Sequence, residues 1–295
     1  MDKIDDDRAR SVAIVIPTFN RCEFLKIAIE SALNQTLPCE VVVCDHGSTD
    51  DTPAMMKKFS DKVRYVRRED DFGPHFCWLE GILNTNCYYL HIQFDDDWID
   101  NTYIERCVEL MRDDVGVVIA EASGNFKFKE FFLTSGVFPM KKLDKLLLKG
   151  NMYSPGASLF RKQDLVDALY QGELPFSKHS AYHGVGPDSF FTFLVALRYK
   201  KVGIIVEHLV YFREHDNSIT CNANNDPVKY VQIKNAYSDV TSYYMFLKWY
   251  WLFNKLRLFN FWYIGGMFTL FAGKTLKKIG LYDIVRRFMR NNKNK

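Results

Sequence analysis

The sequence lacks the glycine-rich loops that hold phosphates in two large classes of nucleotide-binding protein. Neither GxGxxG nor GxxxxGKS/T follows the first apolar run, residues 11–16. A dinucleotide-binding site and a Walker site are therefore disfavoured. If this chain binds a nucleotide, a metal ion and basic side chains must hold most of its phosphate charge.

Paired cysteines and a secretory signal are also missing. The seven cysteines are scattered, and none of them belongs to a CxxC pair. An odd number of unpaired cysteines is typical of free thiols in a reducing compartment, where most of them fill the core. The first ten residues are polar and show no targeting peptide, so we expect a cytoplasmic protein.

No uncharged run is long enough to cross a bilayer. The longest run in the aromatic-rich C-terminal part, residues 258–273, has 16 residues, whereas a spanning helix needs about 20. Residues 248–295 contain 11 Lys or Arg and one acid, Asp283, although the whole chain has a net charge of only +3. This basic part predicts helices lying on an anionic membrane surface. The alternative is a helical appendage packed on the catalytic domain or on a second subunit.

Apolar runs alternate with segments of helical periodicity through the first 120 residues, which predicts βαβ units and a mostly parallel sheet. We expect strands at 11–16, 40–44, 63–66, 88–94 and 115–120, and helices at 24–33, from Pro53, at 73–83 and at 101–111. Residues 121–150 show no clear pattern. Beyond them we expect a loop entering a strand at 153–160, helices at 164–170 and 189–199, a polar loop at 179–188, and two strands at 202–206 and 209–212.

Three polar clusters follow three of the expected strands: Thr18 to Arg21, Asp45 to Asp50, and Asp95 to Asp97. Ligands bind at the carboxyl ends of parallel strands, so these clusters should meet on one edge of the sheet. Three consecutive carboxylates repel one another and become tolerable beside a divalent cation or a cationic ligand. The alternative is a solvated acidic loop.

These clusters and two later segments resemble the motifs of the inverting GT-A glycosyltransferases of family 2, over about residues 11–220. The matching segments are Pro17-Thr-Phe-Asn-Arg21, Asp45-His-Gly-Ser-Thr-Asp50, the acidic (DXD) metal motif Asp95-Asp96-Asp97-Trp98, Gly186-Pro-Asp188, and Arg213-x-His215-x-x-Ser218. Each motif is weak alone. Together, in order and at strand ends, they form a strong signal.

The resemblance implies an α/β fold: a GT-A, Rossmann-like nucleotide-sugar-binding domain with a mostly parallel central sheet and a C-terminal helical appendage. We expect a catalytic domain at 1–222, with a nucleotide-sugar half at about 11–120 and an acceptor half at about 121–222. Residues 223–295 would form the helical, aromatic and basic segment, with a membrane-surface or oligomer contact.

The resemblance also implies roles for individual residues. Asp188 would be the catalytic base, although an aspartate at the start of a helix also serves as a cap. Mn²⁺ or Mg²⁺ would be held by Asp96, Asp97 and His215. Asp45 would accept a hydrogen bond from N3–H of a pyrimidine base, and Asp50 is expected to cap the next helix. The nucleotide-sugar would contact Pro17, Thr18, Asn20, Arg21, Asp45, Gly47, Ser48, Asp95 and Asp96.

The sequence departs from the family pattern at three places, and the last two bear on sugar or acceptor fit. His46 replaces an aspartate, Pro187 replaces the glutamate before Asp188, and Trp78-Leu79 replaces an Arg-Asn pair. The acceptor side would also include His179 and His183. The departures put the identity of the donor in question more than the class of reaction.

The sequence thus predicts an enzyme that moves a sugar from a nucleotide-diphosphate sugar, with UDP favoured, to a glycan or lipid-linked glycan acceptor. Bacterial surface polysaccharide or lipopolysaccharide synthesis fits this activity, at the inner face of the cell membrane. A homo-oligomer is left open, and no module for nucleic acid is present. The alternatives are a nucleotidyltransferase, whose glycine-rich loop is missing, and a non-catalytic glycan-binding protein of the same fold.

Overall fold

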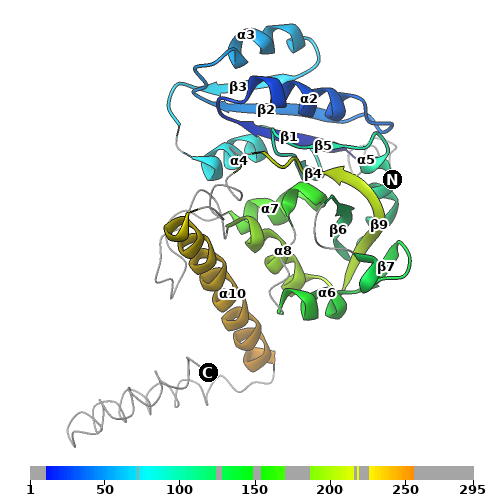
Figure 1. The fold of residues 1–295 in the computed structure, drawn as a ribbon. Helices are drawn as coiled ribbons and strands as arrows, with labels where there is room; N and C mark the ends of the chain where they lie inside the picture. Colours follow the sequence, from blue (N-terminus) through cyan, green and yellow to red (C-terminus); the bar gives the residue numbers. More distant parts are fainter. Residues whose placement is uncertain are drawn as a thin grey trace, which may run out of the picture. The chain divides into compact units, whose positions relative to one another are not determined.

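The computed structural model describes residues 11–71, 73–123, 128–148, 154–169, 187–215, 218 and 226–255. The chain divides into two compact units, Met1–Tyr244 and Met245–Lys295. The described part of the first unit holds a nine-stranded sheet with helices on both faces (Figure 1).

The strands are β1 (Val12–Thr18), β2 (Glu40–His46), β3 (Arg64–Arg68), β4 (Tyr89–Ile92), β5 (Trp98–Ile99), β6 (Val115–Ala122), β7 (Gly136–Pro139), β8 (Ser158–Arg161) and β9 (Lys201–Tyr211). The helices are α2 (Cys22–Leu33), α3 (Thr52–Met56), α4 (Pro74–Leu83), α5 (Tyr103–Leu110), α6 (Met140–Leu147), α7 (Lys162–Ala168), α8 (Pro187–Arg198) and α10 (Pro227–Lys255). Three short 3₁₀ turns are η1 (Lys57–Phe59), η2 (Phe128–Glu130) and η3 (Pro155–Ala157).

The strand order is β3-β2-β1-β4-β8-β6-β9-β5, and β7 pairs with β9. Strands β1 to β4 are mutually parallel, as are β6 and β9, while β8 is antiparallel to β4 and β6. Strands β5 and β7 are antiparallel to β9. Six of the nine strands therefore run in one direction, which confirms the predicted, mostly parallel α/β sheet.

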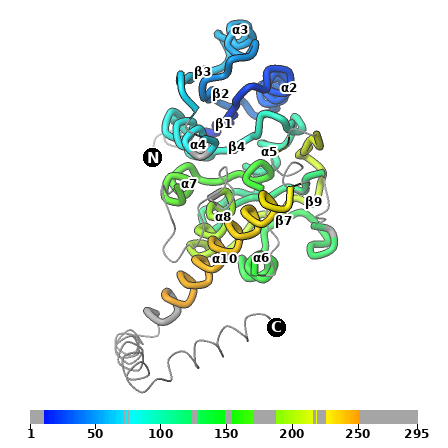
Figure 2. Tube along the Cα trace, turned by 60° about the vertical axis from the view of Figure 1, so that its left-hand side comes forward, coloured from blue at the N-terminus to red at the C-terminus, as the bar shows by residue number. Residues whose placement is uncertain are grey.

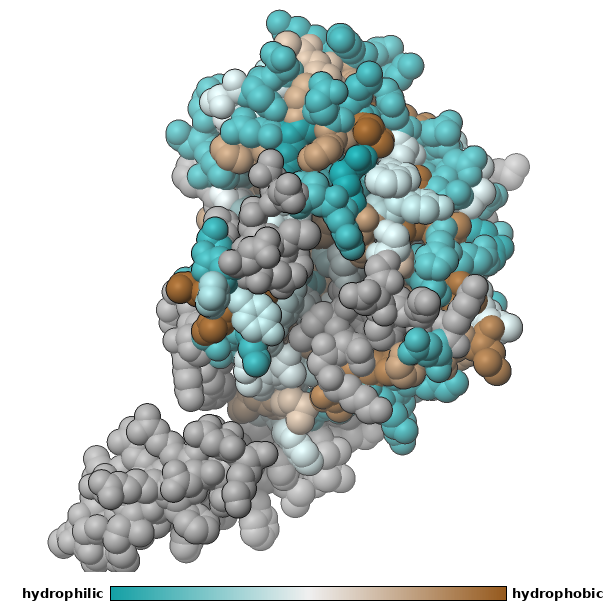
Figure 3. Space-filling view, viewed as in Figure 1, coloured by the Kyte–Doolittle hydropathy of each residue, from teal (hydrophilic) through white to brown (hydrophobic). Residues whose placement is uncertain are grey.

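Helices cover the two faces of the parallel half differently. Ile14 and Val43 point into a core cluster with Leu25 and Ile29 of α2. On the other face α4 comes so close that a Cβ on Gly81 would lie 2.2 Å from a methyl carbon of Val15. Figure 3 shows hydrophilic side chains gathered over the α3 and β3 end of the sheet. The parallel half of the sheet thus lies between two helical layers that cover its faces, and the ends of its strands stay available for a site.

The two strands predicted at 202–206 and 209–212 are one strand, so that prediction was wrong. Strand β9 is 11 residues long, and the exposed pair Glu207 and His208 interrupts an otherwise buried pattern. The register with β6 shifts beside Glu121, which pairs with His208. This irregularity absorbs the two polar residues without ending the strand.

Part of the segment that shows no clear pattern in the sequence is folded onto β9. Strand β7 pairs along β9, with Gly136 opposite Ile204, and α6 follows it directly. The two-residue strand β5, just after the acidic triplet, also pairs with β9. Elements this short carry too little periodicity for a sequence to reveal them.

The first compact unit extends past residue 222 and includes α10 as far as Tyr244. Figures 1 and 2 both show this part of α10 running past α8. Tyr244 is buried and stacks on Phe193 of α8 with ring centroids 4.5 Å apart, and Tyr243 lies 5.7 Å from Phe190. The domain boundary placed at residue 222 stays a prediction.

Among the residues that the structure describes, no helix is both long enough and apolar enough to span a bilayer. Within the described part of the second unit, Trp249 and Tyr250 are exposed. Most of the predicted basic segment, from residue 256 onward, lies outside the described residues.

His91 of β4 is a buried titratable group in the core. Its Nδ1–H donates to the carbonyl oxygen of Ser158 at 3.0 Å. Burial lowers its pKa from 6.5 to about 4. Between these two pH values the unfolded chain binds a proton that the folded chain refuses, so stability falls as pH drops through this window.

We therefore expect the contribution of His91 to the free energy of unfolding to fall by about 2 kcal/mol between about pH 7 and about pH 5. His91→Gln does not titrate and should lack this part of the pH dependence. Urea unfolding of both proteins at the two pH values measures the difference. Parallel losses in the wild type and the variant would contradict the prediction.

Candidate active site

The polar clusters after β1 and β4 meet on one edge of the sheet, as predicted. The hydroxyl of Thr18 donates to Asp95 Oδ2 at 2.8 Å. One guanidinium nitrogen of Arg21 lies 2.9 Å from Asp95 Oδ1 and 2.7 Å from Asp96 Oδ2. Arg21 immediately precedes α2, so the start of this helix carries a cation to the acidic triplet.

The acidic triplet is only partly solvated. Asp95 and Asp97 are buried. Burial raises the pKa of Asp95 to about 6, against the opposing effect of Arg21. Burial and the charge of Asp96 raise the pKa of Asp97 to about 8. Burial therefore disfavours the charged forms of Asp95 and Asp97, and a bound cation would stabilise them.

The end of β9 supplies two further groups to the triplet. The backbone N–H of Arg213 donates to Asp97 Oδ1 at 3.0 Å, and its Nε donates to the carbonyl oxygen of Asp96 at 3.1 Å. His215 Nε2 lies 3.0 Å from Asp96 Oδ2. The structure thus brings the predicted ligands His215 and Asp96 together, whereas the carboxylate of Asp97 is bonded to the main chain of Arg213.

Aromatic rings hold Arg213 in place, which sequence reasoning missed. Its guanidinium carbon lies 4.9 Å from the ring centroid of Phe24 and 5.0 Å from that of Trp98. Trp98 in turn stacks on Tyr211 at 5.3 Å. The spacing Arg213-x-His215 was the only signal in the sequence; nothing marked Phe24, which lies in α2.

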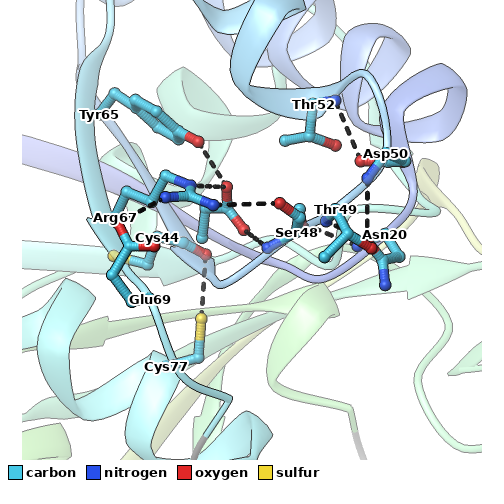
Figure 4. A network of polar contacts seen from close by, with 11 residues as sticks. Asn20, Cys44, Ser48, Thr49, Asp50, Thr52, Tyr65, Arg67, Glu69 and Cys77 are labelled. Atoms are coloured by element: carbon cyan, nitrogen blue, oxygen red, sulfur yellow. Dashed lines mark hydrogen bonds and ion pairs between the residues drawn. The ribbon is translucent and has the colours of Figure 1, made fainter.

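The Asp45 carboxylate already has three partners and is fully buried. Its Oδ1 accepts the backbone N–H of Ser48 at 2.9 Å, while Oδ2 accepts from the hydroxyl of Tyr65 and lies 3.4 Å from Nε of Arg67. Figure 4 shows Tyr65, Arg67 and Ser48 within one network of polar contacts. Contact between Asp45 and a nucleotide base stays a prediction, and the base must reach a carboxylate that is covered on all sides.

Asn20, Gly47 and Ser48, which were predicted to bind the nucleotide, form contacts that stabilise the turn after β2. Asn20 has a positive φ of 54°; its backbone N–H donates to Ser48 Oγ at 2.9 Å, and its Oδ1 accepts from Thr49 N at 2.7 Å. Gly47 has a φ of +81°, and a Cβ there would lie 2.4 Å from the carbonyl oxygen of Glu69. These contacts lock the ends of β1 and β2 together. Pro17 is buried within β1.

Asp50 bonds to the first backbone N–H of two helices. Its Oδ1 accepts from the N–H of Thr52, the first residue of α3, at 3.0 Å, and its Oδ2 accepts from that of Cys22, the first residue of α2, at 3.0 Å. The N-cap position of α3 itself belongs to Asp51, one residue after the predicted cap. A cavity of about 520 Å³ opens beside it at the start of α2 and is lined by Asn20, Arg21, Cys22, Glu23, Phe24, Asp50 and Asp51.

His46, the departure in the second motif, faces away from Asp45. It is buried, and its Nε2 lies 3.3 Å from Glu80 of α4. Burial lowers its pKa, although Glu80 works in the opposite direction. Glu80 also pairs with Arg68 at 2.5 Å. His46 therefore joins β2 to α4 on the face opposite to α2.

Asp188 lies in the first turn of α8. Its Oδ1 accepts from the backbone N–H of Ser189 at 2.7 Å. The negative charge of Asp188, together with the burial of Tyr237 itself, raises the pKa of Tyr237 in α10. Asp188 of α8 thus lies close to Tyr237 in the first part of α10. Gly186, His179 and His183 lie outside the described residues.

Comparison with known proteins places this arrangement in context. A family model described as "Glycosyl transferase family 2" matches residues 13–168. Chondroitin synthase of Escherichia coli is 29% identical over 114 residues, which cover 37% of this chain and 16% of that protein. Glycosyltransferase GlyA of Streptococcus pneumoniae is 25% identical over 223 residues, covering 71% of this chain and 31% of its own length. The chain therefore spans less than a third of these relatives.

Solved structures share the fold at low sequence identity. TarS residues 1–349 of S. aureus, in complex with UDP-GlcNAc, superposes with a TM-score of 0.56 at 16% identity, over 70% of this chain and 60% of that one. The mannosyltransferase PcManGT of Pyrobaculum calidifontis, in complex with GDP-Man and Mn²⁺, gives 0.51 at 15% identity, over 92% and 84%. Both comparisons concern the fold.

Proposed function

The chain belongs to glycosyl transferase family 2, and from this membership we propose that it transfers a sugar from a nucleotide-diphosphate donor to an acceptor hydroxyl, with inversion. One observation carries the proposal: Arg21, at the start of α2, and His215, beyond β9, both reach the same carboxylate oxygen of Asp96. The acidic triplet is thus bordered by a guanidinium and an imidazole from two distant parts of the chain, which supports a site for a diphosphate and its counter-ion.

The residues present fit a divalent cation. Carboxylate oxygens and an imidazole nitrogen suit Mn²⁺, and oxygen ligands suit Mg²⁺. Within the described ranges no three His, Cys, Asp or Glu side chains are grouped so that they could hold a metal ion, so the donor phosphates would have to complete the coordination. Asp96, Asp97 and His215 would hold it. When bound, it supplies charge neutralisation for the departing diphosphate.

The chain's own groups would carry the remaining steps. Arg21 would attract the diphosphate, because its guanidinium lies beside the carboxylates of Asp95 and Asp96, next to the proposed ion. Asp188 would take the proton from the acceptor hydroxyl as that oxygen attacks the anomeric carbon, and the diphosphate would leave from the opposite side. The acceptor would approach from the side of α8.

For the donor we propose a UDP-sugar. Solved relatives in complex with UDP-GlcNAc or UDP support it, as does a carboxylate at the predicted base position. A complex of another relative with GDP-Man keeps GDP-sugars as the comparison. A glycan or lipid-linked glycan acceptor, held at the inner face of the membrane near the basic C-terminal part, completes the proposal. The names of the relatives, which include chondroitin synthase, support a polysaccharide product.

The experiment is a thermal-shift panel of UDP- and GDP-sugars with and without Mn²⁺, followed by an assay for release of the nucleoside diphosphate. We expect one nucleotide class to raise the melting temperature only when Mn²⁺ is present. Release of the diphosphate should then follow addition of a glycan acceptor. Donor binding with no turnover on any acceptor would favour a non-catalytic binding protein, and no response to any nucleotide would refute the proposal.

A further inference from the structure

The side-chain amide of Gln93 is buried directly before the acidic triplet. Gln93 is 1% exposed and lies between β4 and helix α2. Its Nε2 lies 2.9 Å from the carbonyl oxygen of Ala28, 3.1 Å from Ser31 Oγ and 3.3 Å from the carbonyl oxygen of Asp97. A buried amide is costly unless it is hydrogen-bonded. The buried Oε1 has no partner among the described residues, so the position of this side chain is specified by the three acceptors around Nε2.

Helix α2 and the turn that follows it make more bonds to the chain beyond the triplet. Gln35 Nε2 donates to the carbonyl oxygen of Asp100 at 2.8 Å, and Gln35 Oε1 accepts from Ile104 N at 3.1 Å. The backbone N–H of Thr36 donates to the carbonyl oxygen of Asn101 at 2.8 Å. The main chain from Asp97 onward is therefore fastened to α2 at several points.

The opposite end of the same helix holds the triplet by its side chains. Arg21 precedes α2 and pairs with Asp95 and Asp96. Arg21 and Ser31 are separated by ten residues, or about 15 Å of helix. One rigid element thus fixes the carboxylates at one end and the main chain of Asp97 further along. Gln93 is the residue that links the carbonyl oxygen of Asp97 to the main chain of α2.

We propose that Gln93 is a positioning residue for sugar transfer, because its amide ties the main chain of Asp97 to the helix whose first turn holds Asp95 and Asp96. This inference rests on the proposed function. Without the amide, the carbonyl of Asp97 loses its anchor on α2 while Arg213 still holds the carboxylate from the β9 side. The carboxylates then no longer keep a fixed spacing for a metal-bound diphosphate.

The test uses Gln93→Met, which keeps an unbranched side chain of similar length and removes the amide. Thr85→Val is the matched control: Thr85 is also buried, its hydroxyl donates to the carbonyl oxygen of Ile82 at 2.9 Å, and it lies before the opposite end of β4. Hydrogen exchange of the full chain without ligand reports on the bond between Gln93 and the main chain of Asp97. We expect the amides of residues 97–101 to exchange about tenfold faster in Gln93→Met only.

The second readout is binding of UDP and of GDP in the presence of Mn²⁺, by calorimetry on the same three proteins. Gln93→Met should bind the accepted nucleotide about tenfold more weakly, with Thr85→Val unchanged. In the transfer assay the KM for the donor should rise, and the KM for the acceptor should not. If Gln93 had only a structural role, both variants would have lower melting temperatures, while the nucleotide affinity and the KM for the donor would stay at their wild-type values.

Two results overturn the inference alone: unchanged exchange at residues 97–101 in Gln93→Met, or wild-type affinity for the nucleotide with Mn²⁺ despite faster exchange. A wild type that binds neither UDP nor GDP with Mn²⁺ overturns the proposed function, and this inference with it. The wild-type binding curve therefore separates the two failures.

Discussion

Asp188→Asn should lower kcat by about 10²–10⁴-fold, the usual contribution of a general base. The KM for the donor and the melting temperature should stay near their wild-type values. Asparagine caps a helix as well as aspartate does, so its side-chain oxygen can still accept from Ser189 N–H, as Asp188 does at 2.7 Å. It has no affinity for a proton at neutral pH. Initial rates at saturating donor and acceptor measure the loss.

The matched control is Asp226→Asn. Asp226 immediately precedes α10 and accepts from the backbone N–H of Val228 at 2.9 Å, so it is a capping aspartate outside the proposed chemistry. Its substitution should leave kcat unchanged. If Asp188→Asn also retains wild-type kcat, Asp188 serves α8 as a cap and the base must be sought elsewhere.

Asp96→Asn is expected to lower kcat/KM by about 10²–10³-fold, corresponding to several kcal/mol of lost charge stabilisation in the transition state. Its Oδ2 is the point at which Arg21, at 2.7 Å, and His215, at 3.0 Å, meet. An amide there leaves both groups facing a neutral partner and removes one anionic ligand. Nucleotide binding should lose its dependence on Mn²⁺.

Glu109→Gln provides the comparison for loss of one negative charge. Glu109 is an exposed partner of Arg106 at 3.4 Å on α5, and exposed pairs of this kind contribute little. Activity and Mn²⁺ dependence should match the wild type. A full Mn²⁺ response in Asp96→Asn would instead assign the ion to Asp97 and Asp95 without Asp96.

The sequence predicted the parallel half of the fold and the meeting of the strand ends because both follow from local patterns. Continuous apolar, β-branched-rich runs such as Ser11–Ile16 are typical of strands buried on both faces of a parallel sheet. Once such strands are parallel, their polar ends share an edge. The chain therefore reveals Thr18, Arg21 and Asp95 as neighbours without any knowledge of their contacts.

What stayed hidden depends on pairing between distant segments. The ring of Phe24 packs on Arg213 across most of the chain, and Gln93 has no motif around it. The continuity of β9 through Glu207 and His208 follows from a register shift in its partner β6. No local pattern encodes a partner's register, so these features required the three-dimensional structure.

Strand β9 also has a consequence for the order in which the protein matures. Arg213 and His215 contact the triplet across 116 and 119 residues of chain. Contacts at such separations form late, because loop closure must precede them. On the ribosome, β1 to β4 are complete long before β9 emerges, and until then β6 offers a bare edge to other nascent chains. Pairing of β9 with β6 covers that edge and brings Arg213 and His215 to the triplet, so a chain that has not finished folding would lack the proposed donor site.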